Sequence, residues 1–228
     1  YCENFLSMMF ANDGESAVDS ALSNAMDLIF LLHADHEQNC STSTCRMIAS
    51  GGANPFASLA GAVSALWGPL HGGANMAVIN MLNDIHSSGD DGSKFIQSAK
   101  EGKSRLMGFG HRVYRAEDPR ARHMRDGVER LSKEMGQPHW FEILQALVDA
   151  MKPYSRHGVN VNVDFYAGVV YFLHGIPEDL FVPIFAIGRV PGWTVQVLEQ
   201  LENNILIRPL TEYTGPEERE YVPIDQRS

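Results

Sequence analysis

The first amphipathic stretch of the chain runs from Ser16 to His33. Its apolar positions recur at alternating steps of four and three residues, which places them along one side of a helix. These positions are Val18, Leu22, Ala25, Ile29 and Leu32. The pattern therefore predicts an amphipathic helix whose C-terminal end carries His33 and, shortly after it, His36.

Residues 47–83 contain no Asp, Glu, Lys or Arg. Length alone is compatible with a membrane hairpin, but Gly- and Pro-containing pairs interrupt the stretch too often for a membrane span. The piece 56–66 is rich in Ala, Gly and Ser and predicts a tightly packed, buried helix that starts at Pro55. A second helix is predicted over 74–85, and His71, the only ionisable side chain in the stretch, is predicted at the junction between the two.

The rest of the chain alternates helical patterns with short breaks. A charged helix is predicted from Pro119 to about Met135, and one extended stretch over 160–166 carries Asp164 in an apolar run. The other predictions are a loop at 87–92, a turn at 153–158, helices over 140–151, 167–173, 180–189 and 193–202, and an irregular C-terminus from Arg208. The predicted fold class is therefore mainly α.

Composition is that of an ordinary globular protein of one or two domains, with 228 residues, 44% hydrophobic and 20% charged. The formal net charge of −10 argues against a nucleic-acid binder. Residues 100–133 nevertheless carry ten cationic and five acidic side chains, so this segment is +5 and the remainder −15. The excess surrounds His111, which follows Gly108-Phe109-Gly110, and predicts a site for a small, multiply charged anion.

Neither a metal site nor a targeting segment is apparent in the sequence. Cys40-x4-Cys45 has no second cysteine pair, and His33-x-x-His36-Glu37 lacks the order and the third ligand of a zinc helix. The three cysteines fit a reducing compartment. The sequence shows no signal peptide and no charge-flanked apolar span. Because it starts at Tyr1 rather than Met, any targeting segment is expected upstream of Tyr1.

Four histidines and one aspartate are candidate functional residues, although each has a structural explanation when taken singly. A histidine near a helix end is commonly a capping or structural hydrogen-bond partner, and an isolated aspartate commonly caps a helix. The candidates are His36, His71, His111 and Asp164, with His33 as a weaker one.

Read together, the neighbourhoods of these residues resemble the citrate synthase family. The three active-site motifs of the family are similar to the segments Trp67-Gly-Pro-Leu-His71-Gly-Gly-Ala-Asn75, Gly108-Phe-Gly-His111-Arg-Val-Tyr-Arg115 with Asp118-Pro-Arg120, and Asn162-Val-Asp164-Phe-Tyr. Two further signatures match His33-Ala-Asp-His36-Glu-Gln-Asn39 and Gly188-Arg189 followed by Gly192-Trp193. Five matches in the same order cover essentially the whole chain.

The resemblance implies a reaction and three catalytic residues. Family members condense oxaloacetate with acetyl-CoA and hydrolyse the citryl-CoA thioester to citrate and CoA. By analogy Asp164 is the base that takes a methyl proton, His71 donates a hydrogen bond to the thioester oxygen, and His111 polarises the oxaloacetate carbonyl. An apolar surround raises the pKa of a carboxyl group and favours a neutral imidazole, which suits these roles.

The resemblance also implies the binding residues. Oxaloacetate is a dianion and is expected to be held by Arg120 and Arg189, with His36 beside them and Arg208 reaching in from a partner subunit. Arg115 is expected to contact a CoA phosphate, and the backbone of Met107, Gly108, Phe109 and Gly110 to receive the adenine. Acetyl-CoA is a co-substrate, and no cofactor or metal is expected.

The resemblance implies two helical domains and a homodimer or higher homo-oligomer. Residues 1–72 and 174–228 are expected to belong to a large domain, and residues 73–173 to a small, mobile, CoA-binding domain. The N-terminal part of the large domain is absent from the sequence, so exposed apolar surface and weak or no activity of the 228-residue chain alone are expected. A cytoplasmic enzyme of the bacterial type is expected, without nucleic acid or membrane partners.

Two alternatives remain open at the sequence level. A 2-methylcitrate synthase shares the same histidines and aspartate but uses propionyl-CoA; the segment His33–Asn39 resembles the citrate form more closely. The other alternative is a helical fragment that binds ligand or a partner without turnover.

Overall fold

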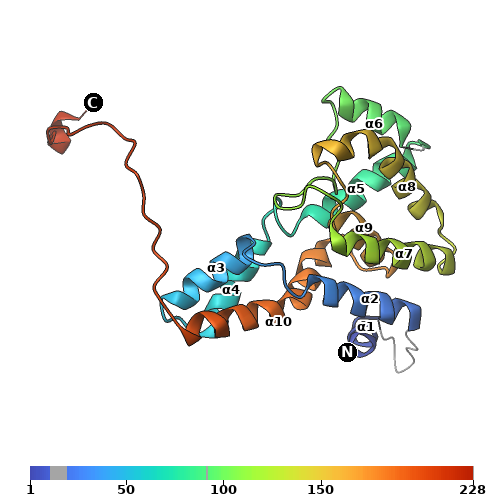
Figure 1. Ribbon diagram of the computed structural model, residues 1–228, viewed down its shortest axis with the longest axis horizontal. Helices are drawn as coiled ribbons and strands as arrows, with labels where there is room; N and C mark the ends of the chain where they lie inside the picture. Colours follow the sequence, from blue (N-terminus) through green and yellow to red (C-terminus); the bar gives the residue numbers. More distant parts are fainter. Residues whose placement is uncertain (11–19, 91, 228) are drawn as a thin grey trace.

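The computed structural model describes residues 1–10, 20–90 and 92–227, and this part of the chain is mainly helical (Figure 1). Its only β-type pairing is an isolated antiparallel bridge between Phe109 and Val161. The α-helices are α1 Cys2–Phe10, α2 Ser20–His33, α3 Cys40–Ser50, α4 Pro55–Leu66, α5 Ala74–Ser87, α6 Ser93–Lys100, α7 Pro119–Glu134, α8 His139–Met151, α9 Asp164–Leu173 and α10 Phe181–Glu202. Short 3₁₀ turns cover Lys152–His157, Glu178–Leu180 and Ile224–Gln226. The mainly α prediction is confirmed.

Side-chain caps and prolines determine where several helices begin. The Asn39 side chain accepts from the Thr42 N–H at 3.1 Å at the start of α3, and Asn54 accepts from the Ala57 N–H at 2.9 Å at the start of α4. Asp118 caps α7. In α4 and α7 a proline follows the cap directly, where its missing N–H loses no helical hydrogen bond.

Helix α10 is continuous, so the predicted separation into 180–189 and 193–202 is wrong. Pro191 lies inside the helix and removes one main-chain hydrogen bond. Burial of the residues around it, including Trp193 and Val197, offsets this loss. The helical segment Glu178–Glu202 is long and apolar enough to cross a membrane by length and composition, and half of its apolar window is buried inside the fold.

The predicted extended stretch 160–166 is shorter in the structure. Val161 pairs with Phe109, whereas Asp164 is already the first residue of α9, three residues earlier than the predicted helix start. The Asn162 side chain accepts from the Asp164 N–H at 3.1 Å and ends the extended segment. Asp164 therefore lies at a helix N-terminus rather than on a strand.

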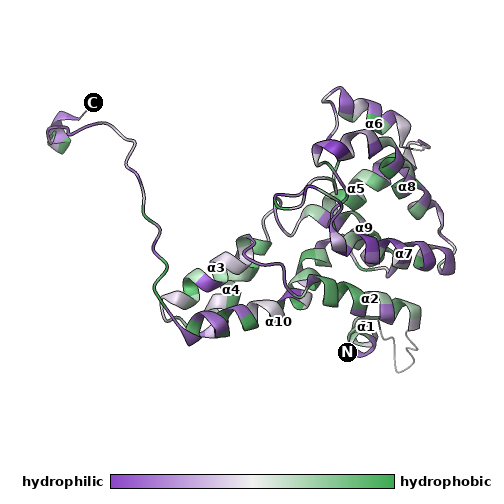
Figure 2. Ribbon diagram, viewed as in Figure 1, coloured by the Kyte–Doolittle hydropathy of each residue, from purple (hydrophilic) through white to green (hydrophobic). Residues whose placement is uncertain are grey.

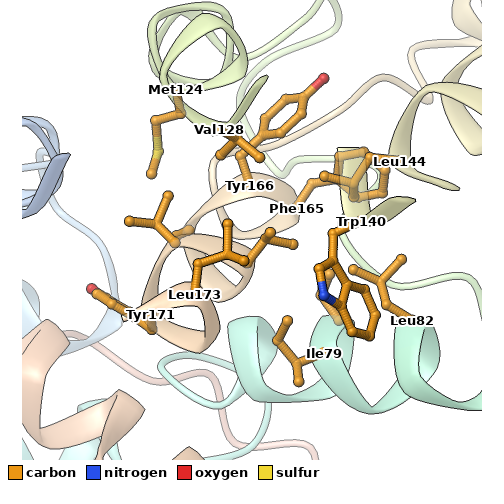
Figure 3. Close-up of a cluster of buried hydrophobic side chains, with 14 of the residues drawn as sticks. Ile79, Leu82, Met124, Val128, Trp140, Leu144, Phe165, Tyr166, Tyr171 and Leu173 are labelled. Carbon is orange, nitrogen blue, oxygen red and sulfur yellow. The ribbon is translucent and has the colours of Figure 1, made fainter. Parts of the chain in front are cut away.

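The main hydrophobic core surrounds α9, which packs between α5 and α7 (Figure 3). Phe165 and Tyr166 from the start of α9 are fully buried there, beside Ile79 of α5 and Val128 of α7. This packing fixes the position of the turn that carries Asp164.

A second, smaller core joins α3, α4 and α10, with Trp193 of α10 fully buried in it. The expectation that the helix from Pro55 is buried is wrong for its outer side, because only one face of α4 packs against α3 and α10. Phe56 is 84% exposed and Trp67, just after α4, is 64% exposed. The expected exposed apolar surface is thus present, and α10 adds Val195, Leu198 and Leu201 to it. Figure 2 shows hydrophobic stretches along this part of the fold.

The C-terminal segment leaves the helices as an extended, exposed chain (Figure 1). Two hydrogen bonds to Ser50 hold its beginning: the Asn204 side chain donates to the Ser50 carbonyl oxygen, and the Ile207 N–H donates to the Ser50 hydroxyl, both at 3.0 Å. The predicted irregular C-terminus is confirmed, with a short 3₁₀ turn at Ile224–Gln226.

Candidate active site

His71 lies in the turn between α4 and α5, as predicted, and is held by Ser41 of α3. The Ser41 N–H donates to Nε2 of His71 at 3.3 Å, and the Ser41 hydroxyl lies 2.9 Å from the same nitrogen. The Trp193 indole N–H donates to that hydroxyl at 3.3 Å. Because Nε2 accepts, the ring proton resides on Nδ1. Burial, with a smaller contribution from the Arg189 charge, lowers the pKa of His71 to about 4, so the ring is neutral.

His111 follows a loop that is fixed by main-chain hydrogen bonds. The Gly110 N–H donates to the Asn160 carbonyl oxygen at 2.7 Å, and the Asn162 N–H donates to the Gly108 carbonyl oxygen at 3.0 Å. Gly108 has φ +81°, and a Cβ there would lie 2.6 Å from the Phe165 ring. Only glycine fits this position, for both conformational and steric reasons.

The imidazole of His111 is oriented by its own turn. Its Nδ1 accepts from the N–H groups of Val113 at 3.0 Å and Tyr114 at 3.1 Å, which leaves Nε2 as the hydrogen-bond donor. The ring stacks on Tyr114, with centroids 4.6 Å apart, and meets the ring of His36 edge-on at 5.2 Å. Burial lowers the pKa of both histidines, that of His36 to about 4.

Arg189 is almost fully buried in α10. Its Nε donates to the His33 carbonyl oxygen, its guanidinium lies 5.0 Å from the centroid of the Phe185 ring, and its Nη1 has no partner among the described residues. Burial lowers its pKa to about 10. A buried guanidinium with an unused donor is suited to receive a ligand carboxylate.

The carboxyl group of Asp164 lies in the field of both candidate arginines. Burial raises its pKa to about 6, while the positive charges of Arg120 and Arg189 lower it and the negative charge of Asp118 raises it. The same arginines lower the pKa of His36, and Arg189 lowers that of His71. These five candidates and His111 therefore form one electrostatic neighbourhood.

The remaining predicted site residues lie around or away from this cluster. Phe109 packs edge-on against Phe165 at 4.9 Å, and the Met107 N–H faces the Met81 sulfur at 3.4 Å. Arg115 lies beside Gly158, whose Cβ would be 3.3 Å from the arginine side chain. Arg208 is exposed on the C-terminal segment, which leads away from the helices, so the fold of this chain does not bring it to the cluster (Figure 1).

Sequence reasoning missed several side chains that hold the candidates in place. These are Ser41 beside His71, Tyr114 beside both His36 and His111, Asp118 paired with Arg120, and Asn162, whose amide donates to the Gly110 carbonyl oxygen at 3.0 Å. Tyr114, Asp118 and Asn162 lie inside the motifs that resemble the family, and this is the signal by which the sequence could have pointed to them. Among the described residues, no group of three His, Cys, Asp or Glu could hold a metal ion.

We expect the fold to lose stability as the pH falls from about 6.5 towards 4. The pKa is about 3 for His33 and about 4 for His36 and His71, below the value of about 6.5 for an unperturbed histidine. The unfolded chain therefore binds more protons in this interval, so acid favours unfolding. Thermal unfolding across this range and ring-proton NMR titrations test this; midpoints near 6.5 for all three rings would contradict it.

Comparison with known proteins identifies the family. A family model described as the citrate synthase C-terminal domain matches residues 1–210. Citrate synthase 1 of Mycobacterium tuberculosis is 44% identical over 234 residues, 99% of this chain and 54% of the relative. Citrate synthase of Corynebacterium glutamicum is 45% identical with the same coverage, and 2-methylcitrate synthase 1 of that organism is 40% identical over 99% of this chain and 58% of the relative.

Solved structures agree with these matches. Citrate synthase of Thermoplasma acidophilum, in a ternary complex with carboxymethyl coenzyme A and oxaloacetate, superposes with a TM-score of 0.90 at 36% identity, covering 100% of this chain and 60% of that one. Citrate synthase of Pyrobaculum aerophilum gives 0.85 at 38% identity, covering 99% and 56%.

The helical fold and the matches together define an all-α enzyme family. The chain belongs to the citrate synthase family. It spans about half the length of the curated relatives it matches.

Proposed function

We propose that the protein of which this chain forms part condenses oxaloacetate with acetyl-CoA and hydrolyses citryl-CoA to citrate and CoA. The observation that carries the proposal is the Asp164 carboxyl, whose pKa of about 6 suits a base near neutral pH, in one neighbourhood with two arginines and three neutral histidines. The similar citrate synthase of Thermoplasma acidophilum forms a complex with oxaloacetate and a CoA derivative, which supports the same substrates.

In the first step the Asp164 carboxylate takes a proton from the methyl group of acetyl-CoA. Negative charge develops on the thioester oxygen, and the N–H of neutral His71 donates a hydrogen bond to it. Ser41, whose hydroxyl accepts from the Trp193 indole N–H, holds the His71 ring in the tautomer described above, so the ring N–H is already oriented. The step yields the enolate of acetyl-CoA, hydrogen-bonded to His71, and protonated Asp164.

In the second step the methylene carbon of the enolate attacks the keto carbon of oxaloacetate. The His111 Nε2–H donates a hydrogen bond to the keto oxygen, where negative charge develops, and then gives this proton to the oxygen to form the citryl-CoA hydroxyl. The proton that Asp164 took in the first step returns to solvent, from which His111 is reprotonated. Water then cleaves the thioester and releases citrate and CoA. The overall reaction is that of an acyltransferase which converts the acyl group into an alkyl group on transfer.

The binding residues keep the roles that the family resemblance implies. Arg120, Arg189 and His36 hold the two carboxylates of oxaloacetate, and Arg208 of a partner subunit completes the site in a homodimer. Arg115 and the loop 107–110 bind CoA. Residues 73–173 form the small domain, whose closure over the large domain excludes water during condensation. We infer a cytoplasmic enzyme.

The alternative acyl donor is propionyl-CoA. It is considered because one similar protein is named 2-methylcitrate synthase 1. Thiol release with oxaloacetate is measured for acetyl-CoA and propionyl-CoA on the intact protein. Higher kcat/KM with acetyl-CoA supports the proposal, and higher kcat/KM with propionyl-CoA replaces it with the 2-methylcitrate reaction. Oxaloacetate binding without thiol release from either thioester would leave only a ligand-binding function.

Arg120→Lys is expected to weaken oxaloacetate binding about ten-fold. Lysine keeps the charge but cannot make a two-pronged contact with a carboxylate. Calorimetric titration with oxaloacetate measures the change, and Arg122→Lys, an exposed position on the same helix, is the matched control. Equal affinities of the two variants would show that Arg120 does not touch the substrate.

A further inference from the structure

Asp118 is a fully buried carboxylate at the start of α7 whose hydrogen bonds divide between two elements. Its Oδ1 accepts from the N–H and from the Nε of Arg120, both at 3.0 Å, and its Oδ2 accepts from Nη2 of Arg120 at 2.8 Å. Its Oδ2 also accepts from the Val163 N–H at 3.3 Å. One side chain thus contacts both Arg120 and the residue before Asp164.

The main chain of Asp118 strengthens the second connection, because its N–H donates to the Val161 carbonyl oxygen at 3.1 Å. The guanidinium of Arg120, in turn, donates to both carboxylate oxygens in a two-pronged contact. A long arginine side chain held in this way has little rotamer freedom left to lose when a ligand binds.

The charges around Asp118 indicate that its ion pair with Arg120 does more than cap α7. A serine or asparagine would suffice to cap α7. A buried ion pair has a large desolvation penalty and does not by itself stabilise a fold. Here the negative charge balances Arg120 beside Asp164, so its removal changes the field at the base as well as the position of the arginine.

We propose that Asp118 is a positioning residue that fixes the Arg120 guanidinium and the Val163–Asp164 turn relative to each other, so that the carboxylate-binding group and the base are aligned before substrate arrives. The inference rests on the proposed function. Asp118 touches neither substrate nor the reacting atoms, and it acts through Arg120 and through the main chain of Val163.

Asp118→Asn is expected to raise the KM for oxaloacetate at least about ten-fold, because an amide presents only one acceptor oxygen and places its NH₂ against the N–H donors of Arg120. The acid limb of the kcat/KM profile is expected to move to lower pH. Four groups interact electrostatically with the Asp164 carboxyl: Asp118 and Arg120 at the start of α7, Arg189 of α10, and Tyr171, which lies on the same helix as Asp164. Loss of the one negative charge in that set favours the ionised base, which lowers its pKa.

Glu117→Gln is the matched control, since it removes one negative charge from the adjacent residue, an exposed carboxylate 3.4 Å from Arg125. We expect its KM and pH profile to equal those of the unmodified protein. A role in folding alone would reduce the amount of active Asp118→Asn protein without moving the acid limb or the KM of the folded fraction. That result would overturn the proposal.

Two further measurements keep the test decisive. If Asp118→Asn does not fold, Asp118→Ser retains a capping oxygen and is measured in the same way. The NMR signal of the Arg120 Nε–H reports the contact without turnover: we expect slow exchange with solvent in the unmodified protein and fast exchange in the variant. If the unmodified protein releases no thiol, the proposed function fails, and unchanged Nε–H exchange in the variant would independently refute the positioning role.

Discussion

Asp164→Asn is expected to lower turnover about a thousand-fold while leaving oxaloacetate affinity within a few-fold of the unmodified protein. General-base catalysis typically contributes about 10²–10⁴-fold, and asparagine cannot accept the methyl proton. Oxaloacetate would still meet Arg120 and Arg189, whose contacts do not depend on the base. Thiol release and calorimetric titration with oxaloacetate separate the two effects.

The pKa of Asp164 also predicts how activity and stability depend on pH. Activity should fall as the pH drops through about 6, because the carboxyl becomes protonated. The contribution of this group to stability has the opposite dependence on pH. Its pKa in the folded state is raised above the unfolded value of about 3.9, so the folded state binds more protons between about pH 4 and 6. The contribution of Asp164 to stability therefore falls as the pH rises through that interval. Asp164→Asn should therefore unfold at a higher temperature than the unmodified protein above pH 6.

Asp179→Asn is the control for both readouts, since Asp179 is an exposed carboxylate in the 3₁₀ turn before α10. It should leave turnover and thermal stability unchanged. Asp164→Asn protein that retains normal turnover would exclude the assignment of Asp164 as the base.

Gly192→Ala is expected to destabilise the fold by more than about 3 kcal/mol. A Cβ at Gly192 would overlap the carbonyl oxygen of Ala34 and lie 2.8 Å from its carbonyl carbon. The obstacle is main chain rather than a flexible side chain, so α10 and the segment after α2 would have to separate. Denaturant unfolding measures the loss.

The same substitution should disturb the candidate site, because Ala34 lies between His33 and His36. Separation would displace the His33 carbonyl oxygen that accepts from Arg189 and the ring of His36 beside His111. Gly127→Ala is the control: Gly127 lies within α7, and its Cβ would meet only the Leu28 side chain, at an ordinary 3.8 Å. Alanine there should stabilise the protein by up to about 1 kcal/mol. Equal stabilities of the two variants would contradict the steric argument.

The sequence predicts helices well where apolar periodicity or a cap-proline pair marks them. The helix from Pro119 and the junction at His71 were predicted to within about a residue. Helix α3, by contrast, was not predicted: its Ser- and Thr-rich sequence has no clear apolar stripe, and these residues favour turns. The Asn39 cap and packing against α4 and α10 make it helical, and the second of these contacts depends on residues far along the chain.

The candidate site shows a similar division. The residue pattern led to His36, His71, His111 and Asp164, and the resemblance to citrate synthases added Arg120 and Arg189. The structure brings these residues into one neighbourhood, and their chemical roles remain predictions. The hydrogen bond from Ser41 to His71 and the contact of Tyr114 with His36 could not be predicted, since they depend on the packing of α3 against the α4–α5 turn and on the fold of the loop after His111.

The pairing of residues 108–110 with residues 160–162 consists mainly of main-chain hydrogen bonds. It holds the segments that carry His111 and Asp164 with little dependence on which side chains surround them. Replacement of neighbouring side chains can therefore reshape the space around these segments while the proposed catalytic side chains keep their separation. This is in keeping with relatives that are named citrate synthase and 2-methylcitrate synthase and that are each 40% identical to this chain.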